Sequence, residues 1–143
     1  MTYTTDLLEG LADELTGGAL GVYRPDGIYT PDETGIVLAV MPPDPDRAIC
    51  LTAYPVEDSD LSDAVTGVQV RLRAGTDPRQ VTDLADGVFD LLHNREAYRL
   101  RGIYVALSWR QSQAWIGQDT HGRQELTANY YLRTTRPAPH LID

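Results

Sequence analysis

The sequence predicts an α+β fold: a single largely antiparallel β-sheet with two α-helices packed on one face. Three observations support this prediction. An amphipathic helical segment opens the chain, a strand with a tight turn and a capped helix occupies residues 67–94, and alternating strand patterns fill most of residues 103–133. The resulting order, α-β-β-β-α-β-β, keeps helices and runs of strands apart, which is typical of α+β domains.

The first helix is predicted from an apolar stripe. Thr4 or Thr5 can cap it, and Asp6 lies in its first turn, where the helix dipole favours an acid. Gly17 and Gly18 are typical of a helix C-terminus. The stripe that should face the sheet consists of Leu7, Leu8, Leu11, Ala12 and Leu15.

Two apolar strands are predicted on either side of a proline-rich segment. Residues 36–41 are continuously apolar, which is typical of a strand covered on both faces. The prolines of residues 42–46 cannot lie inside a strand, so this segment should connect the first strand to residues 48–54. We interpret the two strands as an antiparallel hairpin. The acidic segment that follows, residues 55–62, is expected to be a mobile loop.

The central unit of the fold is predicted at residues 67–94. Val68, Val70 and Leu72 alternate with polar residues, as in a strand with one solvent-facing side. Asp77 can cap the helix that follows, and Pro78 suits its first position. The helical face that should pack on the sheet consists of Val81, Leu84, Ala85, Val88, Leu91 and Leu92.

The last third of the chain is predicted to be mostly strand. Residues 95–100 are expected to be a linker of mixed charge. Apolar and polar residues alternate over 103–110 and again over 126–133, as they do in strands. We expect residues 1–135 to form one domain and residues 136–143 to be a flexible C-terminal tail.

Composition excludes several classes of protein. The net charge of −9 argues against a protein that binds nucleic acid by neutralising phosphates. No apolar run approaches the ~20 residues of a membrane helix, and the N-terminus lacks the basic flank of a secretory signal. We therefore expect a cytosolic start and no membrane partner. Cys50 is the only cysteine, so it can form no intrachain disulfide.

Residues with catalytic or metal-binding chemistry are few and scattered. His93, His121 and His140 lack the spacing of metal ligands. Residues 58–63 resemble a calcium loop, but Gln69 stands where the bidentate glutamate belongs. We therefore predict no enzymatic activity, no metal and no cofactor. A solvent-facing helix side is the simpler interpretation of the remaining acidic set, Asp83, Asp86 and Asp90.

Aromatic residues are concentrated in the predicted last strands. They admit two interpretations, a core with a covered sheet or a protein–protein surface, because tyrosine, tryptophan and arginine are enriched at interface centres. The residues are Tyr104, Trp109, Trp115, Tyr130 and Tyr131.

The central unit resembles the "minor capsid protein" family of long-tailed bacteriophages, which is similar to the tail-terminator and neck proteins that cap the tail tube. The resemblance covers roughly residues 5–135, and it includes the leucine-rich first helix, the proline-broken hairpin and the tyrosine-rich last strand. The residues that carry it are Val68 to Arg73, Gly75, Asp77, Pro78, Leu84 to Asp86 and Leu91 to His93.

The resemblance implies a structural phage protein, a tail terminator or a related head–tail joining subunit. Such a subunit forms a ring, commonly a hexamer, at the head–tail junction of the virion, and it assembles in the host cytoplasm. Its partners would be copies of itself, the tail tube and the head-completion or connector proteins, and DNA could pass through the ring without sequence-specific contacts. No catalytic residues belong to this pattern. Two alternatives stay open: a small-ligand- or metal-binding enzyme that uses the acidic loop 57–63, and a cellular protein-interaction module.

The charge distribution suggests where ring neighbours could meet. Of the 21 acidic residues 13 precede residue 67, whereas 10 of the 12 arginines follow it. A ring needs a heterologous interface, in which two different patches meet. We expect Asp58 and Asp60 of one subunit to face Arg71 and Arg73 of the next, with Tyr131 at the same interface. The alternative is that these arginines are solvated or pair within the subunit.

Overall fold

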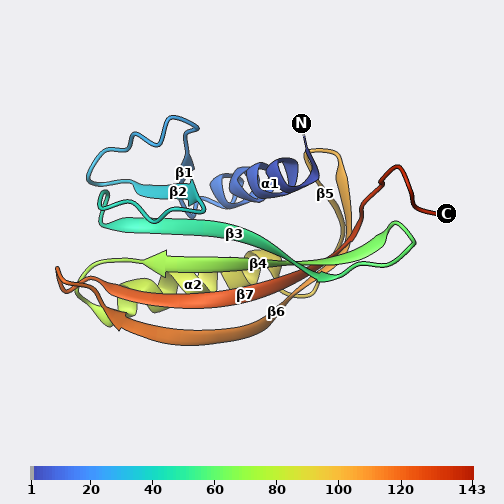
Figure 1. Ribbon diagram of the computed structural model, residues 1–143. Coiled ribbons are helices and arrows are strands. Elements are labelled where there is room, and N and C mark those ends of the chain that lie inside the picture. The colour runs from blue at the N-terminus through green and yellow to red at the C-terminus, as the bar shows by residue number, and fades with distance from the viewer. Residues whose placement is uncertain (1) are drawn as a thin grey trace.

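The computed structural model describes residues 2–143 and shows a curled seven-stranded sheet with two helices (Figure 1). The strand order is β1-β2-β3-β4-β7-β6-β5, and every pairing from β3 to β5 is antiparallel. The α+β prediction is therefore confirmed. In chain order the elements are α1 (Tyr3–Gly17), β1 (Val22–Tyr23), β2 (Thr34–Leu38), β3 (Arg47–Glu57), β4 (Asp63–Arg73), α2 (Pro78–Leu92), β5 (Arg95–Leu100), β6 (Ile103–Gln118) and β7 (Gln124–Thr135).

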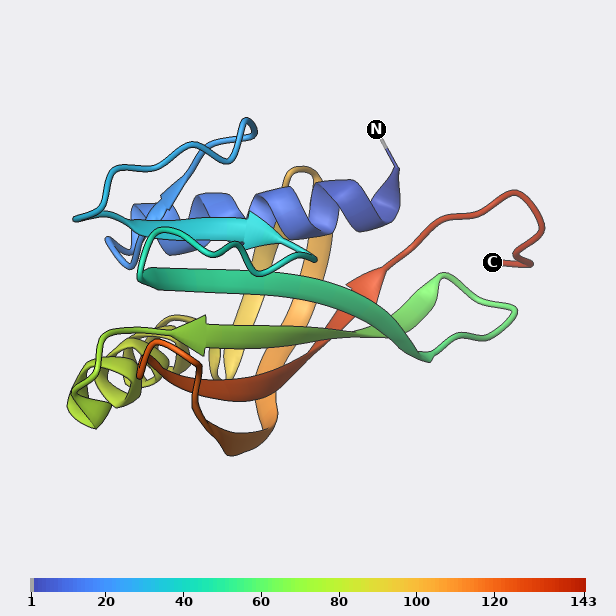
Figure 2. The ribbon, with the colours of Figure 1, turned by 60° about the vertical axis from the view of Figure 1, so that its left-hand side comes forward.

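Both helices pack on one face of the sheet. The hydroxyl of Tyr3 in α1 lies 2.7 Å from the hydroxyls of Thr66 and Thr134, and Ser108 Oγ donates to the carbonyl of Leu92 at the end of α2. Strands β5 and β6 turn up behind α1 (Figure 2). Gly10 permits this close approach, because a Cβ there would lie 2.7 Å from the Leu100 Cβ.

The two helices follow the predicted pattern with small differences. In α1 the whole predicted stripe is buried, and the helix ends at Gly17 as predicted. It begins at Tyr3, however, before the predicted cap, because the Tyr3 contacts hold this first turn against the sheet. Helix α2 begins after Asp77, whose carboxylate accepts a hydrogen bond from the Arg79 amide at 3.0 Å. Val81, Ala85, Val88 and Leu92 are buried, while Leu84 and Leu91 are only partly buried.

The predicted antiparallel hairpin of the second and third strands is wrong. Strands β2 and β3 pair in parallel, with Thr34 opposite Arg47 and Leu38 opposite Leu51. Ala39, at a φ of 68°, turns the chain, and residues 40–46 then run back to the start of β3. A tight two-residue turn would enforce an antiparallel pair, but a connection of this length does not.

The predicted linker at residues 95–100 is also wrong, because it forms β5. Leu100 lies opposite Ile103, and between them Arg101 and Gly102 have φ values of 45° and 85°. Positive φ at both central positions is the geometry of a two-residue hairpin turn. The mixed charge of the segment concealed the strand, since only Tyr98 and Leu100 are buried within it.

In β6 the predicted alternation breaks. A register shift between Val105 and Leu107 makes Val105 and Ser108 both buried, and it turns Leu107 and Trp109 to the other face. Such a bulge adds one residue to one strand, so it reverses the facing of every residue that follows.

Strands β3 and β4 extend farther than predicted and project from the body of the molecule as a two-stranded arm (Figure 1). We define the arm as residues 55–66, with the loop 58–62 at its tip. The C-terminal segment 136–143 runs beside that tip. No helix within residues 2–143 is long and apolar enough to cross a membrane.

Candidate functional site

The face of the sheet opposite to the helices, which we call the open face, carries an ordered aromatic and polar surface. Trp109 and Tyr131 meet edge to face, with ring centroids 5.8 Å apart. Tyr54 lies over Gly67, where any Cβ would overlap its ring, and its hydroxyl donates to Asn129 Oδ1 at 3.0 Å. Burial raises the pKa of Tyr54, and Tyr131 contributes in the same direction. Partly buried aromatics with polar neighbours are typical of interfaces.

The structure separates the two arginines that the sequence grouped together. Arg71 lies on the open face with a side chain that is 42% exposed, and its Nε donates to Glu125 Oε1 at 2.7 Å. Arg73 is only 3% exposed. Its guanidinium donates to the carbonyls of Pro45 at 2.6 Å and Asp46 at 2.9 Å. Burial, and then the neighbouring Arg123, lower the pKa of Arg73. Arg73 therefore holds a loop of its own subunit.

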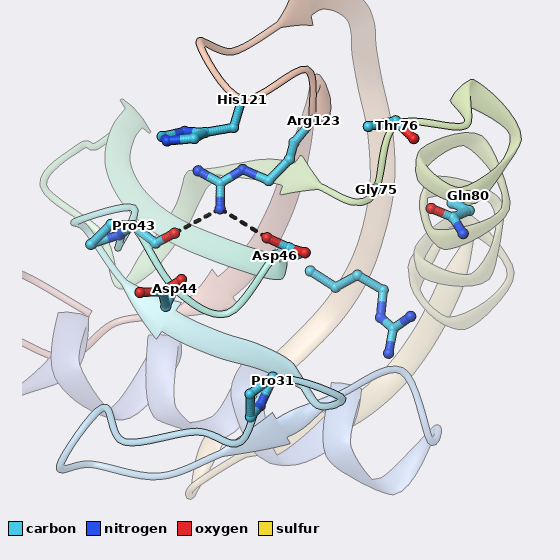
Figure 3. Close-up of a pocket in the computed structure, with 10 residues that line it drawn as sticks. Pro31, Pro43, Asp44, Asp46, Gly75, Thr76, Gln80, His121 and Arg123 are labelled. Atoms are coloured by element: carbon cyan, nitrogen blue, oxygen red, sulfur yellow. Dashed lines mark hydrogen bonds and ion pairs between the residues drawn. The ribbon is translucent and has the colours of Figure 1, made fainter.

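A second buried arginine holds the same loop from the other side. Arg123 donates to the carbonyl of Pro43 at 2.6 Å and lies 3.3 Å from Asp46 Oδ1 (Figure 3). All three residues line a polar cavity of about 540 Å³. Its Nε donates to Asp119 Oδ2 at 2.7 Å. Burial alone would raise the pKa of Asp119, but hydrogen bonds from Arg123 and from the His121 amide lower it to about 2. We call this region, residues 43–46, 73 and 119–123, the loop end.

The two predicted acidic residues lie at the opposite end of β4. Asp58 and Asp60 lie in the tip of the arm, eleven or more residues from Arg71 along the chain. The fold of the subunit does not bring them together with Arg71. The C-terminal segment is hydrogen-bonded to this tip. The Arg136 amide donates to the Ser62 carbonyl at 2.7 Å, and the Ile142 amide donates to the Asp60 carbonyl at 2.9 Å.

Asp143 adds further hydrogen bonds between the C-terminal segment and the tip of the arm. The amide of Ser62 donates to the Asp143 carboxylate at 3.0 Å, and the Ser62 hydroxyl donates to it at 2.6 Å. These hydrogen bonds lower the pKa of Asp143. Asp143 is exposed and Ser62 is half-buried. We call residues 58–62 and 136–143 together the arm end.

An apolar pocket of about 630 Å³ lies beside the β5–β6 turn. Tyr3, Ile103, Tyr104 and Pro137 contribute to its walls. Arg99 also lines it, with its guanidinium 5.5 Å from the centroid of the Tyr104 ring. The guanidinium of a second arginine, that of residue 136, lies 4.3 Å from the centroid of the Tyr3 ring. This turn pocket is therefore apolar inside, with the basic side chain of Arg99 at its rim, while Arg136 packs on Tyr3 without lining the pocket.

Most of the arginines are already paired within the subunit. Seven of them lie within 3.3 Å of a carboxylate: Arg24, Arg71, Arg79, Arg95, Arg101, Arg123 and Arg133. In the described part of the chain the other five have no carboxylate partner: Arg47, Arg73, Arg99, Arg110 and Arg136. Pairing within the subunit, the alternative raised by the sequence, therefore holds for much of the basic half.

The histidines lie far apart in structural positions. The His93 ring stacks on Phe89 with centroids 4.4 Å apart, and its Nδ1 accepts from the Arg110 amide. His121 lies in the β6–β7 turn, and His140 lies in the C-terminal segment. Among residues 2–143, no group of three His, Cys, Asp or Glu side chains could hold a metal ion.

Sequence reasoning missed the loop end and the turn pocket. Asp119 and Arg123 flank a turn, and this i, i+4 pair was a signal that could have pointed to the ion pair. The targets of Arg73 and Arg123 are main-chain carbonyls, which carry no sequence signal. The pocket gathers residues from three separate segments of the chain, so it becomes visible only in three dimensions.

Comparison with known proteins adds a family and a fold. The family model for bacteriophage tail terminator proteins matches residues 14–136. A solved structure from the virion of a native gene transfer agent particle is 14% identical, with a TM-score of 0.55, and the match covers 69% of this chain and 78% of that one.

A second solved structure, of a protein whose description names no function, is 17% identical with a TM-score of 0.52. This match covers 95% of this chain and 99% of that chain. At these identities the two structures show a shared fold. A search of curated proteins gives no match.

Proposed function

Because the chain belongs to the bacteriophage tail terminator family, we propose that it closes into a ring of about six copies at the head–tail junction. The family is structural, and the chain is accordingly a structural protein of the virion with a tail-capping role. Its other partners would be the tail tube and the head-completion or connector proteins, with DNA passing through the ring. Assembly would take place in the host cytoplasm.

The polarity of the subunit is the observation that supports a ring. The arm end projects at one end of β4, whereas Arg71 and the loop end lie at the other. A closed ring requires two unlike patches on each subunit, and a subunit with two unlike ends supplies them.

The proposed charge contact between neighbouring subunits involves fewer residues than the sequence suggested. We propose that Asp58 and Asp60 approach Arg71 of the next subunit, with Tyr131 on the same open face. Arg73 is bound within its own subunit and would act by holding the loop end. The contact is modest in strength, since Arg71 is half exposed and already paired with Glu125.

We also propose that residues 1–135 act as one folded domain and that residues 136–143 are a flexible tail that becomes ordered on assembly. The hydrogen bonds that hold this tail connect exposed or half-buried groups. Such bonds are weak in water, so a neighbouring subunit could replace them at little cost.

Native mass spectrometry of the purified chain, with sedimentation across a concentration series, tests the ring. We expect a closed species of about six subunits that forms at the expense of monomer. A chain that stays monomeric at every accessible concentration would contradict the proposal.

Charge reversal at Arg71 tests the proposed contact separately. Arg71→Glu should weaken assembly, because it places like charges opposite the arm tip. Arg24→Glu is a matched control, since Arg24 is also ion-paired and is 41% exposed, but it lies in the β1–β2 loop. If the folded Arg71→Glu subunit forms rings as readily as the control, the arginine contact is wrong while the ring stands.

A further inference from the structure

The outer edge of β6 is exposed over its second half. Strand β5 pairs with β6 only as far as Arg95 opposite Ser108. Beyond that point no strand in residues 2–143 pairs with this edge, and the stretch exposes two large apolar side chains. Trp115 is 48% exposed and Ile116 is 51% exposed.

This edge lacks two of the features that protect free strand edges, proline and closely spaced charge, although register shifts between Arg110 and Ser112 and between Trp115 and Gly117 interrupt it. Native proteins block such edges with proline or charge. The free part of β3 carries both, since Pro55 and Glu57 lie in the arm, outside the stretch paired with β2. The free part of β6, residues 109–118, contains no proline, and Arg110 is its only charged residue. The β6 edge is therefore suited to an interface.

The turn pocket is a matching receptor that the subunit cannot fill by itself. Ile103 and Tyr104 of the pocket begin β6, whereas Trp115 and Ile116 lie near its end. Twelve residues of strand span about 40 Å, so the two features of one copy cannot meet. A second copy can bring them together.

Resting on the proposed ring, we propose that Trp115 and Ile116 of one copy dock in the turn pocket of the neighbour whose arm tip approaches Arg71 of that copy. A volume of about 630 Å³ can receive large apolar side chains, and the aromatic walls of Tyr3 and Tyr104 suit an indole ring. The contact is heterologous, because the apolar pair and the pocket are different patches of the same chain.

Charge complementarity favours a second copy as the occupant. Arg99, the arginine that lines the pocket, has no carboxylate partner within the described chain. Strand β6 runs beside α2, as the Ser108 bond to Leu92 and the stacking of Arg110 on Phe89 show. The exposed side of α2 carries three carboxylates, those of Asp83, Asp86 and Asp90. Docking the end of β6 would therefore bring an acidic helix face toward the basic rim.

Cysteine cross-linking tests this contact on the full chain. The variant Thr135→Cys with Gln113→Cys keeps both Trp115 and the aromatic walls, because Thr135 lines the pocket and the exposed Gln113 lies two residues before Trp115. Treated with a short bis-maleimide, it should give a ladder of covalent multimers. Cys50 is buried, so the unmodified chain supplies the background. The matched control is Thr135→Cys with Ile28→Cys, because Ile28 is 70% exposed but lies in the β1–β2 loop.

The outcomes separate this contact from the ring itself. A ladder in the test pair but not in the control supports docking. Rings in sedimentation without a ladder would overturn the docking and leave the ring intact, whereas a chain that stays monomeric would overturn both.

A second variant keeps the test independent of cross-linking chemistry. Trp115→Ala should raise the concentration for half-assembly by at least about tenfold, as truncation of a buried aromatic anchor does. Ile28→Ala should leave it unchanged. Circular dichroism checks that both variants fold, and unchanged assembly of a folded Trp115→Ala chain would overturn the proposal.

Discussion

The loop end and the arm end lie at opposite ends of β4 and are held in opposite ways. At the loop end, the buried guanidiniums of Arg73 and Arg123 donate to the main-chain carbonyls of Pro43, Pro45 and Asp46. At the arm end, the contacts between residues 58–62 and 136–143 connect exposed or half-buried groups.

The difference in burial predicts a difference in behaviour. A charged hydrogen bond away from water is strong, and it is costly to break because its partners are left unpaired. A hydrogen bond at the surface exchanges readily with water. The loop end is therefore complete within one subunit, while the arm end can rearrange when a neighbour arrives.

Among the changes that test this comparison, removing the buried guanidinium of Arg73 should lower the stability of the fold most. We expect Arg73→Ala to lower the free energy of unfolding by about 3–6 kcal/mol, because two charge-assisted hydrogen bonds are lost at a buried site. Urea denaturation measures the loss. Arg133→Ala on the neighbouring strand β7 is the matched control, because its ion pair with Asp63 is exposed on both sides and should contribute no more than about 1 kcal/mol. Equal losses in the two variants would show that the loop end does not depend on its buried arginine.

Acid should weaken the loop end more than the arm end. The pKa of Asp119 is lowered from 3.8 to about 2 in the folded chain, so this group stabilises the fold above about pH 4. That stabilisation is lost as the pH falls toward 2, because the unfolded chain then binds the proton more readily. Asp119→Asn should therefore flatten the dependence of stability on pH between about pH 4 and pH 2.

Asp143→Asn is the control at the arm end. Hydrogen bonds from Ser62 also lower the pKa of Asp143, but its contacts are exposed and screened by solvent. Urea denaturation at several acidic pH values should show the smaller change for this variant. A larger change than that of Asp119→Asn would reverse the comparison.

The smallest effect is expected where a polar group is buried but unpaired. The Tyr130 hydroxyl is buried without a hydrogen-bond partner among the described residues, and burial raises the pKa of Tyr130 to about 12. Tyr130→Phe should therefore leave the free energy of unfolding unchanged or raise it by up to about 1 kcal/mol. A loss greater than 1 kcal/mol in thermal or urea unfolding would indicate that this hydroxyl has a hydrogen-bond partner. Buried polar groups that are hydrogen-bonded would then not be specific to the loop end.

Sequence patterns were sufficient where one chain segment determines its own structure. The stripe of α1 and the Asp77–Pro78 start of α2 are local signals, and both are confirmed. The parallel pairing of β2 and β3 is not local, because it depends on how Arg73 holds the returning loop. The β6 bulge likewise depends on its register with β7.

The candidate interface shows the same limit. The sequence placed Arg71 and Arg73 on one strand face, but burial depends on the loop that covers that face, so only Arg71 is available to a partner. The turn pocket could not be predicted at all, since Tyr3, the hairpin of residues 99–104 and Pro137 are distant from one another in sequence. Charge asymmetry along a sequence does not reveal which arginines are already paired.

Hydrogen exchange of the free subunit and of the assembled ring most directly tests the claim that the two ends have different roles. We expect the amides of residues 58–62 and 136–143 to exchange rapidly in the free subunit and slowly in the ring. Those of residues 43–46 and 119–123 should exchange at similar rates in both. Strong protection of both arm-end segments in a free monomer, or protection gained on assembly only at the loop end, would contradict the account.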